Sequence, residues 1–250
     1  MDAARTDDNH GALAHDLAAL TREITRCRAC PRLVAWREQV ALEKRAAFRD
    51  DEYWAKPVPG FGDPRARVLC IGLAPAAHGG NRTGRVFTGD RSGDFLFASL
   101  FRCGFANQPT SVTAGDGLKL RDAYITAAVR CAPPANKPTP AERDECAPYL
   151  HRELELLARV RVVVALGAFG YEAAWTTLRD CALEGVALPK RRPRFTHALE
   201  VPCGRVTIVG AFHPSQQNTF TGKLTPAMLD AVFERAAALR TARRSHPPRR

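Results

Sequence analysis

Long hydrophobic runs are absent from this sequence of 250 residues. No stretch approaches the roughly 18 to 20 consecutive apolar residues that a membrane-spanning helix needs. Residues 1–10 are polar and partly acidic, so they lack the apolar segment of a secretory signal. We therefore expect a soluble, cytoplasmic protein without a membrane partner. In that reducing compartment its eight cysteines would be thiols or metal ligands rather than disulfides.

Two common catalytic signatures are also missing. Residues 79–86, GGNRTGRV, resemble a phosphate-binding P-loop in their glycine spacing. However, Arg85 and Val86 stand where Lys and a hydroxyl residue must grip phosphate and magnesium. No G-x-S-x-G elbow is present, and Ser92 and Ser215 lie outside the context of a hydrolase triad. The sequence thus disfavours nucleotide hydrolysis and serine-hydrolase chemistry.

Acidic residues are outnumbered by basic ones. The chain has 37 Lys and Arg against 26 Asp and Glu, which gives a net charge of +11. A surface with this excess attracts polyanions, chiefly nucleic acid or an anionic membrane face. Hydrophobic residues make up 45% of the chain, which is enough for the core of one substantial domain.

Four apolar runs of strand length alternate with helical patterns. The runs lie at 67–73, 123–129, 162–166 and 205–212. The helical patterns lie at 12–25, 91–105, 141–160 and 225–239, and a short one reaches Trp175. This alternation predicts an α/β protein whose parallel sheet is covered on both faces. We expect one domain over residues 1–239 and a disordered basic tail at 240–250.

A glycine-rich stretch follows the first apolar run. Residues 71–94, IGLAPAAHGGNRTGRVFTGDRSGD, hold six glycines, three arginines and two aspartates. An apolar strand that opens into such a turn usually brings the backbone close to a ligand, and open parallel sheets bind ligands at the carboxyl ends of their strands. Asp90 also precedes a predicted helix, so it is alternatively a helix cap, with Asp94 as the competing carboxylate.

Four of the cysteines form a metal-binding pattern. Cys27 and Cys30 make a C-x2-C pair, and Cys131 and Cys146 follow with fourteen residues between them. Four thiolates suit either a zinc ion or a [4Fe–4S] cluster. Structural zinc usually shows two C-x2-C knuckles, so the long second spacing favours the cluster.

Three motifs together resemble those of the family 5 (type B) uracil-DNA glycosylases, the iron–sulfur branch of the uracil-DNA glycosylase superfamily. They are GLAPAAHGGNRTGRVFTGDRSG, C-x2-C…C-x14-C and HPSQQNTFTGK. The resemblance covers residues 27–239 and implies a three-layer α/β/α sandwich around a four-stranded parallel sheet. It also implies a structural [4Fe–4S] cluster on the four cysteines. The implied activity is hydrolysis of the N-glycosidic bond of uracil and other deaminated bases in DNA, leaving an abasic site.

The resemblance implies roles for single residues as well. Related glycosylases carry an acid directly after the first strand, whereas the stretch 72–76 holds none, so Asp90 is the best carboxylate to orient water. Phe87 resembles the aromatic residue that stacks on the extruded base, and His213 the histidine that faces uracil O2. Ala127 replaces the Asn that reads uracil in the sister branch, which leaves Asn136 as the nearest amide.

The predicted site has three groups of residues. The expected catalytic residues are Asp90, His213 and Asn136. The expected base contacts come from Gly72, Leu73, Ala74, Pro75 and Phe87. The expected DNA contacts come from Ser215, Gln216, Gln217, Asn218, Arg191 and Arg192.

The chemistry of glycosidic cleavage suits these residue types. Departure of the base builds positive charge on the sugar and negative charge on the base, which a carboxylate and a histidine N–H would stabilise. No Lys is placed as a covalent nucleophile, so we expect a monofunctional enzyme. We also expect the protein to be a monomer. Two alternatives stay open: a non-catalytic iron–sulfur protein of the same fold that only binds nucleic acid, and a zinc-stapled RNA-binding protein. The latter is less favoured because no aromatic RNA-stacking motif is visible.

Overall fold

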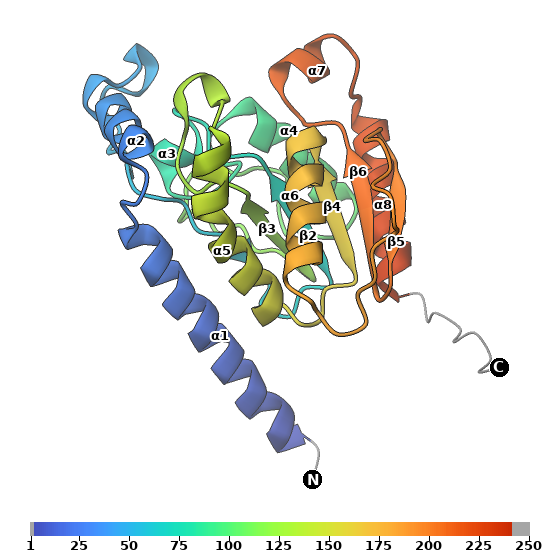
Figure 1. Cartoon of the computed structure of the whole chain (residues 1–250). Coiled ribbons are helices and arrows are strands. Elements are labelled where there is room, and N and C mark those ends of the chain that lie inside the picture. The colour runs from blue at the N-terminus through green and yellow to red at the C-terminus, as the bar shows by residue number, and fades with distance from the viewer. Residues whose placement is uncertain (1–2, 242–250) are drawn as a thin grey trace, which may run out of the picture.

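The computed structural model describes residues 3–241, and its centre is a six-stranded sheet in the order β1-β3-β2-β4-β6-β5 (Figure 1). Strands β2, β3, β4 and β6 run parallel, while β1 and β5 are antiparallel at the two edges. The predicted four-stranded parallel sheet is confirmed, and a short antiparallel strand extends it on each side. The strands are β1 (Phe61–Gly62), β2 (Val68–Gly72), β3 (Ala123–Ala127), β4 (Val162–Leu166), β5 (Glu200–Cys203) and β6 (Val206–Ala211).

The four parallel strands are buried along their whole length, which explains why they read as unbroken apolar runs. Successive residues of a strand face opposite sides of the sheet. In β2, Val68 and Cys70 therefore join one core cluster, and Leu69 and Ile71 join another. Each cluster needs a layer of helices to complete it.

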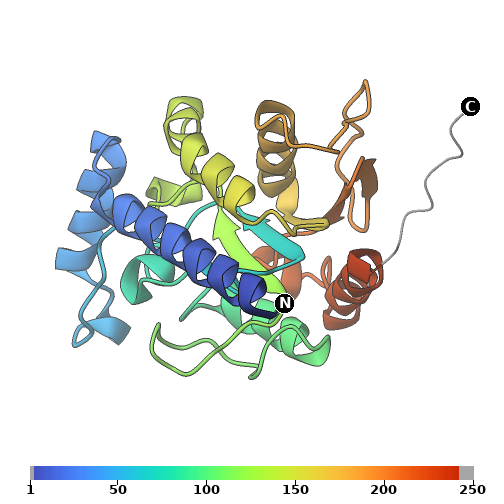
Figure 2. The same cartoon turned by 90° about the horizontal axis from the view of Figure 1, so that it is seen from below.

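Two pairs of helices supply those layers (Figures 1 and 2). Helices α4 (Arg91–Arg102) and α8 (Pro226–Thr241) cover one face, where Leu96 and Phe233 enter the core. Helices α5 (Pro140–Leu156) and α6 (Gly167–Asp180) cover the other, where Leu150 and Trp175 do the same. The result is the three-layer sandwich that the family resemblance implied.

Two N-terminal helices lie outside the sandwich. Helix α1 (Ala3–Arg26) runs along α5 (Figure 1), and the Arg152 guanidinium donates to the Glu23 carboxylate across them at 2.6 Å. Helix α2 (Pro31–Glu43) begins directly after residues 27–30, with proline at its first turn. The sequence interpretation assigned no element there, because α2 has only a weak apolar periodicity and buries Arg37 along with leucine and valine.

Three short helices follow the carboxyl ends of parallel strands. Helix α3 (Gly80–Thr83) follows β2, η2 (Pro134–Asn136) follows β3 and α7 (Gln216–Phe220) follows β6. This is the edge where the ligand site was predicted. A fourth short helix, η1 (Ala46–Phe48), lies between α2 and β1 in the chain. Helix α8 continues through Thr241, two residues beyond its predicted end, and the rest of the predicted tail lies outside the described residues. Among residues 3–241, no helix combines the length and apolar character that crossing a bilayer requires.

Candidate active site

Phe87 occupies a strained position in the glycine-rich turn between β2 and α4. Its backbone φ is +53°, a left-handed conformation that is rare outside glycine. The strain directs the ring onto the end of β2, where a Cβ added to Gly72 would come within 2.7 Å of Phe87 Cζ. Glycine at position 72 is therefore required by the close approach of this ring.

His213 lies directly after β6 and faces the same ring. The ring centroids of Phe87 and His213 are 5.8 Å apart, with an interplanar angle of 35°. Burial lowers the pKa of His213 to about 4, so the imidazole is neutral at physiological pH and carries one N–H donor. The Asn218 side-chain amide donates to the His213 carbonyl oxygen at 2.8 Å, which ties the first turn of α7 to the histidine.

Asp90 stands three residues after Phe87 and caps α4. Its Oδ1 accepts a hydrogen bond from the Gly93 N–H at 2.9 Å, so the alternative interpretation as a helix cap is correct. The second oxygen lies against Gly79, where an added Cβ would be 2.0 Å from Oδ2. Burial raises the pKa of the carboxyl, against hydrogen bonds from the Gly93 and Ser92 N–H groups that lower it. Capping thus engages one oxygen and leaves the other facing the loop.

Two further candidates are exposed. Asp94 is exposed in the first turn of α4, and its charge contributes to the raised pKa of Asp90. Asn136 is exposed in η2 and has a positive φ of 55°. Its catalytic role stays a prediction.

The stretch Leu73 to Pro75 turns its side chains toward neighbouring elements. Leu73 lines a small cavity between α5 and α6, Ala74 packs against the cluster of Cys131 and Cys146, and Pro75 lies beside Gly80. Any contact of this stretch with a base would come from its backbone.

Known proteins resemble this chain along most of its length. A sequence profile of the uracil DNA glycosylase superfamily matches residues 59–237. The chain belongs to this superfamily.

A Type-5 uracil-DNA glycosylase of Mycobacterium bovis is 54% identical over 228 residues, which cover 90% of this chain and 82% of the relative. The Type-5 protein of Thermus thermophilus is 50% identical over 225 residues, covering 90% and 98%. A Type-4 uracil-DNA glycosylase of Archaeoglobus fulgidus is 30% identical over 159 residues, covering 63% and 70%. The resemblance drawn from the three motifs is confirmed.

The four cysteines of this uracil DNA glycosylase superfamily member converge although they are distant in sequence. They line one small pocket where the α1–α2 link meets the segment after β3 and the start of α5. The Arg37 guanidinium donates to Cys131 Sγ at 2.9 Å, and the Arg130 backbone N–H donates to Cys146 Sγ at 3.3 Å. Burial, and then the nearby Cys131 thiol, raises the pKa of Cys30 to about 11. Burial also raises the pKa of Cys146 to about 12, although the Arg130 guanidinium and backbone N–H lower it.

The donor set fits an iron–sulfur cluster in its chemistry. Four soft sulfur ligands with N–H donors aimed at two of them match the ligation and the hydrogen bonding to sulfur that such clusters have. No group of three or more His, Cys, Asp or Glu side chains among residues 13–241 is arranged to hold a single metal ion. A four-iron cluster is wider than one ion, so its ligands stand farther apart.

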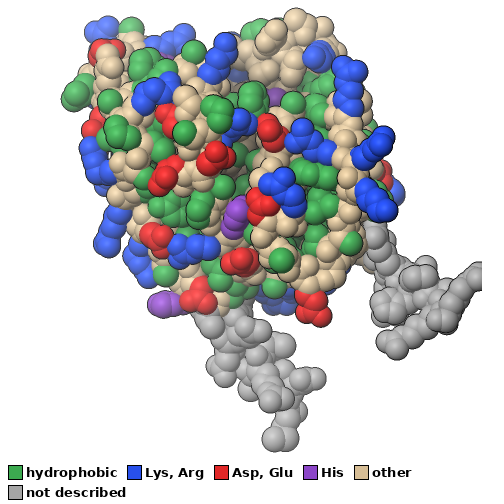
Figure 3. Space-filling view, viewed as in Figure 1, with side chains coloured by type: hydrophobic (Ala, Val, Ile, Leu, Met, Phe, Trp, Pro, Cys, Tyr) green, Lys and Arg blue, Asp and Glu red, His purple; other side chains and the backbone are tan. Residues whose placement is uncertain are grey.

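The predicted DNA contacts lie at the surface. Gln216 and Gln217 are exposed on α7, next to the half-buried Ser215 and Asn218. Arg191 and Arg192 are exposed in the loop between α6 and β5. Figure 3 shows Lys and Arg side chains along the edge of the molecule beside β5.

Sequence reasoning missed the buried arginines around the site. Arg130 has 1% of its side chain exposed and pairs with Glu153, equally buried, at 2.6 Å. Arg37 and Arg85 are buried as well, the first against Cys131 and the second against Asp116. Arg130 stands between an apolar run and Cys131-Ala132, and this apolar setting is the one local signal of its burial.

Proposed function

We propose that this protein excises uracil from DNA by hydrolysing the N-glycosidic bond and leaves an abasic site. The observation that carries the proposal is the meeting of Phe87 and His213 at the carboxyl end of the sheet, with Asp90 in the same turn. The relatives named uracil-DNA glycosylases support it, since they align along nearly the full chain. A protein that binds nucleic acid without cleavage would not require this convergence of an aromatic ring, a neutral imidazole and a half-buried carboxylate.

Each group has a distinct task in the reaction. Breakage of the bond between C1′ and the base leaves positive charge on the sugar and an electron pair on the base. In our proposal the Asp90 carboxylate stabilises the sugar cation and orients the water that adds to C1′. The neutral His213 donates its N–H to the carbonyl oxygen of the departing base, as an oxyanion donor does.

The base must leave the duplex before it reaches these groups. Extrusion costs a few kcal/mol, and stacking on an aromatic ring partly offsets this cost. Phe87 supplies the ring in our proposal, and its fixed backbone holds the ring ready before the base arrives. Because Ala127 and the 73–75 stretch offer few side-chain donors, we propose that other deaminated bases also enter and that uracil opposite guanine is favoured over uracil opposite adenine.

Incubation with a uracil-containing duplex tests the proposal. The parent protein should produce alkali-labile abasic sites on that duplex and none on a matched thymine duplex, and His213→Ala should slow the single-turnover reaction by about 2 to 4 kcal/mol of barrier. Binding of the uracil duplex without any abasic product would instead support the non-catalytic alternative.

We also propose that Cys27, Cys30, Cys131 and Cys146 hold a structural [4Fe–4S] cluster. The sulfur donors and the two N–H groups directed at them support this assignment. When bound, the cluster would cross-link the α1–α2 link to the segment after β3, which also carries Asn136. Protein purified without oxygen should be brown and contain iron and sulfide, and Cys131→Ala should lose both together with solubility. Colourless protein that holds one zinc ion would contradict the assignment.

A further inference from the structure

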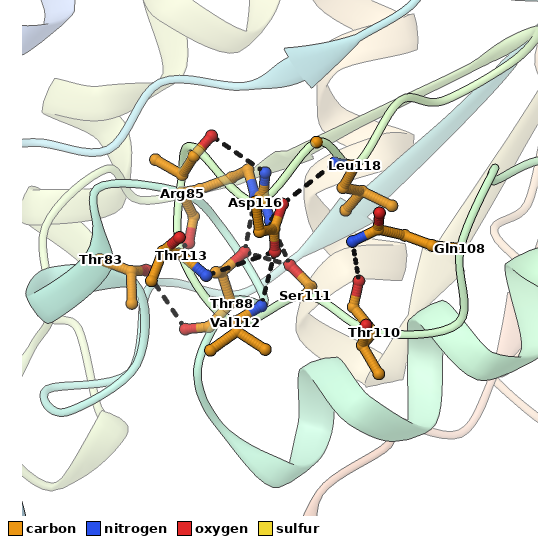
Figure 4. Close-up of polar contacts among 12 residues, drawn as sticks. Thr83, Arg85, Thr88, Gln108, Thr110, Ser111, Val112, Thr113, Asp116 and Leu118 are labelled. Atoms are coloured by element: carbon orange, nitrogen blue, oxygen red, sulfur yellow. Dashed lines mark hydrogen bonds and ion pairs between the residues drawn. The ribbon is translucent and has the colours of Figure 1, made fainter.

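A largely buried polar network links the glycine-rich turn to the loop between α4 and β3 (Figure 4). Its centre is an ion pair in which Arg85 Nη2 lies 2.8 Å from Asp116 Oδ2, with side-chain exposures of 7% and 13%. The Arg85 guanidinium also donates to Ser111 Oγ at 2.8 Å and to Thr88 Oγ1 at 3.0 Å. The two hydroxyl groups are themselves 2.6 Å apart. Every one of these groups is inside the protein and has a partner.

The network joins two segments that have no regular secondary structure. Arg85 and Thr88 belong to the turn before α4, while Ser111 and Asp116 belong to the irregular loop between α4 and β3. Asp116 organises that loop by accepting from the Val112 N–H at 2.7 Å and the Leu118 N–H at 3.1 Å. One backbone hydrogen bond, from the Gly89 N–H to the Ser111 carbonyl oxygen at 2.9 Å, joins the two segments, and the side-chain network adds the ion pair and the hydroxyl contacts.

Phe87 stands between the two anchored residues of the turn. Arg85 precedes it and Thr88 follows it, and the Arg85 guanidinium donates to the Thr88 hydroxyl. The Thr83 hydroxyl can donate to the carbonyl oxygen of either residue, each at 3.3 Å. The left-handed backbone of Phe87 costs of order 1 to 3 kcal/mol and persists only where its surroundings impose it. The network holds the turn on both sides of the strained residue, at Arg85 before it and at Thr88 directly after it.

The same turn seats the start of α4. A Cβ added to Gly93 would lie 1.8 Å from the Phe87 carbonyl oxygen, so the first turn of α4 presses directly on the strained residue. Asp90 accepts from the Gly93 N–H. A shift of Phe87 would therefore move Asp90 with it.

We propose that Arg85 and Asp116 are positioning residues for the glycosidic cleavage. Together with Ser111 and Thr88 they hold the turn in the one conformation that places the Phe87 ring against β2 and the Asp90 carboxylate at Gly79. This inference rests on the proposed function for its catalytic meaning, but the mechanical role of the pair follows from the hydrogen bonds alone. In this role both residues act through the turn and not by contact with the base or the sugar.

The test compares Asp116→Asn with a matched control at the other end of α4. Asp230 accepts from Ser99 Oγ at 2.6 Å and from Arg102 at 2.7 Å, so it has the same kinds of partner, but it joins α4 to α8. Asp230→Asn should leave single-turnover cleavage of a uracil duplex within about threefold of the parent. Asp116→Asn should lower it by about 10- to 100-fold, as a displacement of catalytic groups does, with affinity for an abasic duplex nearly unchanged. Equal losses in both variants would overturn the proposal.

A second comparison separates positioning from general loosening. In an Asp90→Asn background, Asp116→Asn should cost a clearly smaller factor than in the parent, because groups that act through one another are not additive. The same factor in both backgrounds would mean that Asp116 does not act through Asp90, and it would overturn the proposal. Where Asp116→Asn fails to fold, Ser111→Ala takes its place, since it removes one Arg85 partner and keeps the ion pair.

Amide hydrogen exchange gives a readout that does not depend on activity. Asp116→Asn, or Ser111→Ala in its place, should speed exchange at residues 84–93, and Asp230→Asn should not. Unchanged exchange there would overturn the proposal. A parent protein that cleaves no uracil would refute the proposed function instead, while the exchange measurement would still decide whether the pair holds the turn.

Discussion

At Asp90 one carboxylate has two neighbours. Oδ1 caps α4 through the Gly93 N–H, and Oδ2 faces Gly79. A side chain that is fixed by a structural hydrogen bond loses little entropy when it meets a substrate, so the cap would pre-organise the oxygen for the role that we propose. Asp90 therefore combines a structural role, as the cap of α4, with the proposed role in cleavage. A variant that keeps the cap and removes the charge separates the two roles.

Asp90→Asn makes that separation. Asn caps helices as well as Asp does, so the fold should be kept, while the negative charge near C1′ is lost. Single-turnover cleavage should fall by about two to four powers of ten, roughly 3 to 5 kcal/mol of barrier, with DNA affinity retained. Rapid-quench assays of a uracil duplex give the rate. Asp94→Asn, in the exposed neighbour, is the control and should be nearly silent. Parental activity in Asp90→Asn would remove Asp90 from the mechanism.

His213 should make stability depend on pH. Its pKa is lowered by burial from 6.5 to about 4, so the unfolded chain binds a proton more readily than the folded one. The stabilising effect of the neutral form is complete above about pH 6.5 and is lost as the pH falls toward 4, by a few kcal/mol. Between pH 7 and pH 4.5, the free energy of unfolding measured in urea should fall more for the parent than for His213→Gln. The same loss in both proteins would contradict a buried, neutral imidazole.

At the scale of elements, one ion pair joins the end of β3 to α5. The Arg130 guanidinium donates to both carboxylate oxygens of Glu153, at 3.0 and 2.6 Å, and also to the Thr126 hydroxyl. The Gly60 N–H donates to the same carboxylate at 3.3 Å. A buried pair adds little stability by itself, but it is costly to break, because the partner charge stays inside.

Glu153→Gln should therefore destabilise the fold by about 3 to 5 kcal/mol, as measured by chemical denaturation. Glu172→Gln is the matched control: its partner Arg143 lies at 3.0 Å on the surface of α5, and 46% of the Glu172 side chain is exposed. That control should change stability by less than about 1 kcal/mol. Similar effects of the two substitutions would mean that water reaches the Arg130 pair.

At the scale of the whole molecule, the excess of positive charge governs encounter with DNA. A net charge of +11 favours phosphate contacts in which bound counterions are released, so affinity should fall steeply as salt rises. The four arginines after Thr241 (Arg243, Arg244, Arg249 and Arg250) add charge at the end of α8. This electrostatic contribution to DNA affinity does not depend on which base is present.

Truncation after Thr241 tests whether the terminal arginines contribute to DNA binding without taking part in cleavage. The shortened chain should bind duplex DNA more weakly, with a flatter slope of log affinity against log salt, by about 0.9 for each phosphate that the tail no longer neutralises. Its single-turnover rate at saturating protein should match the full chain, because every catalytic candidate is kept. Fluorescence anisotropy across a salt series and single-turnover assays measure the two quantities. A large loss of the chemical step would show that the tail acts at the site.

The layers of this protein and most of its candidate site could be predicted from the order of its residues. Strand runs and helical repeats are local, so β4 was predicted at its observed bounds and α4 at its observed start. The motifs also placed Phe87, Asp90 and His213 at the same edge of the sheet, because parallel strands bring their carboxyl ends together.

Which distant groups meet follows from the packing of the elements. The structure places Asp116 against Arg85 and Glu153 against Arg130, and it adds α2 and the antiparallel edge strands β1 and β5. It also shows that Asn136 is exposed. The physical reason is that periodicity reports which face of an element is buried, whereas the partner of a buried charge is set by how elements pack, and nothing near that residue in the sequence encodes it.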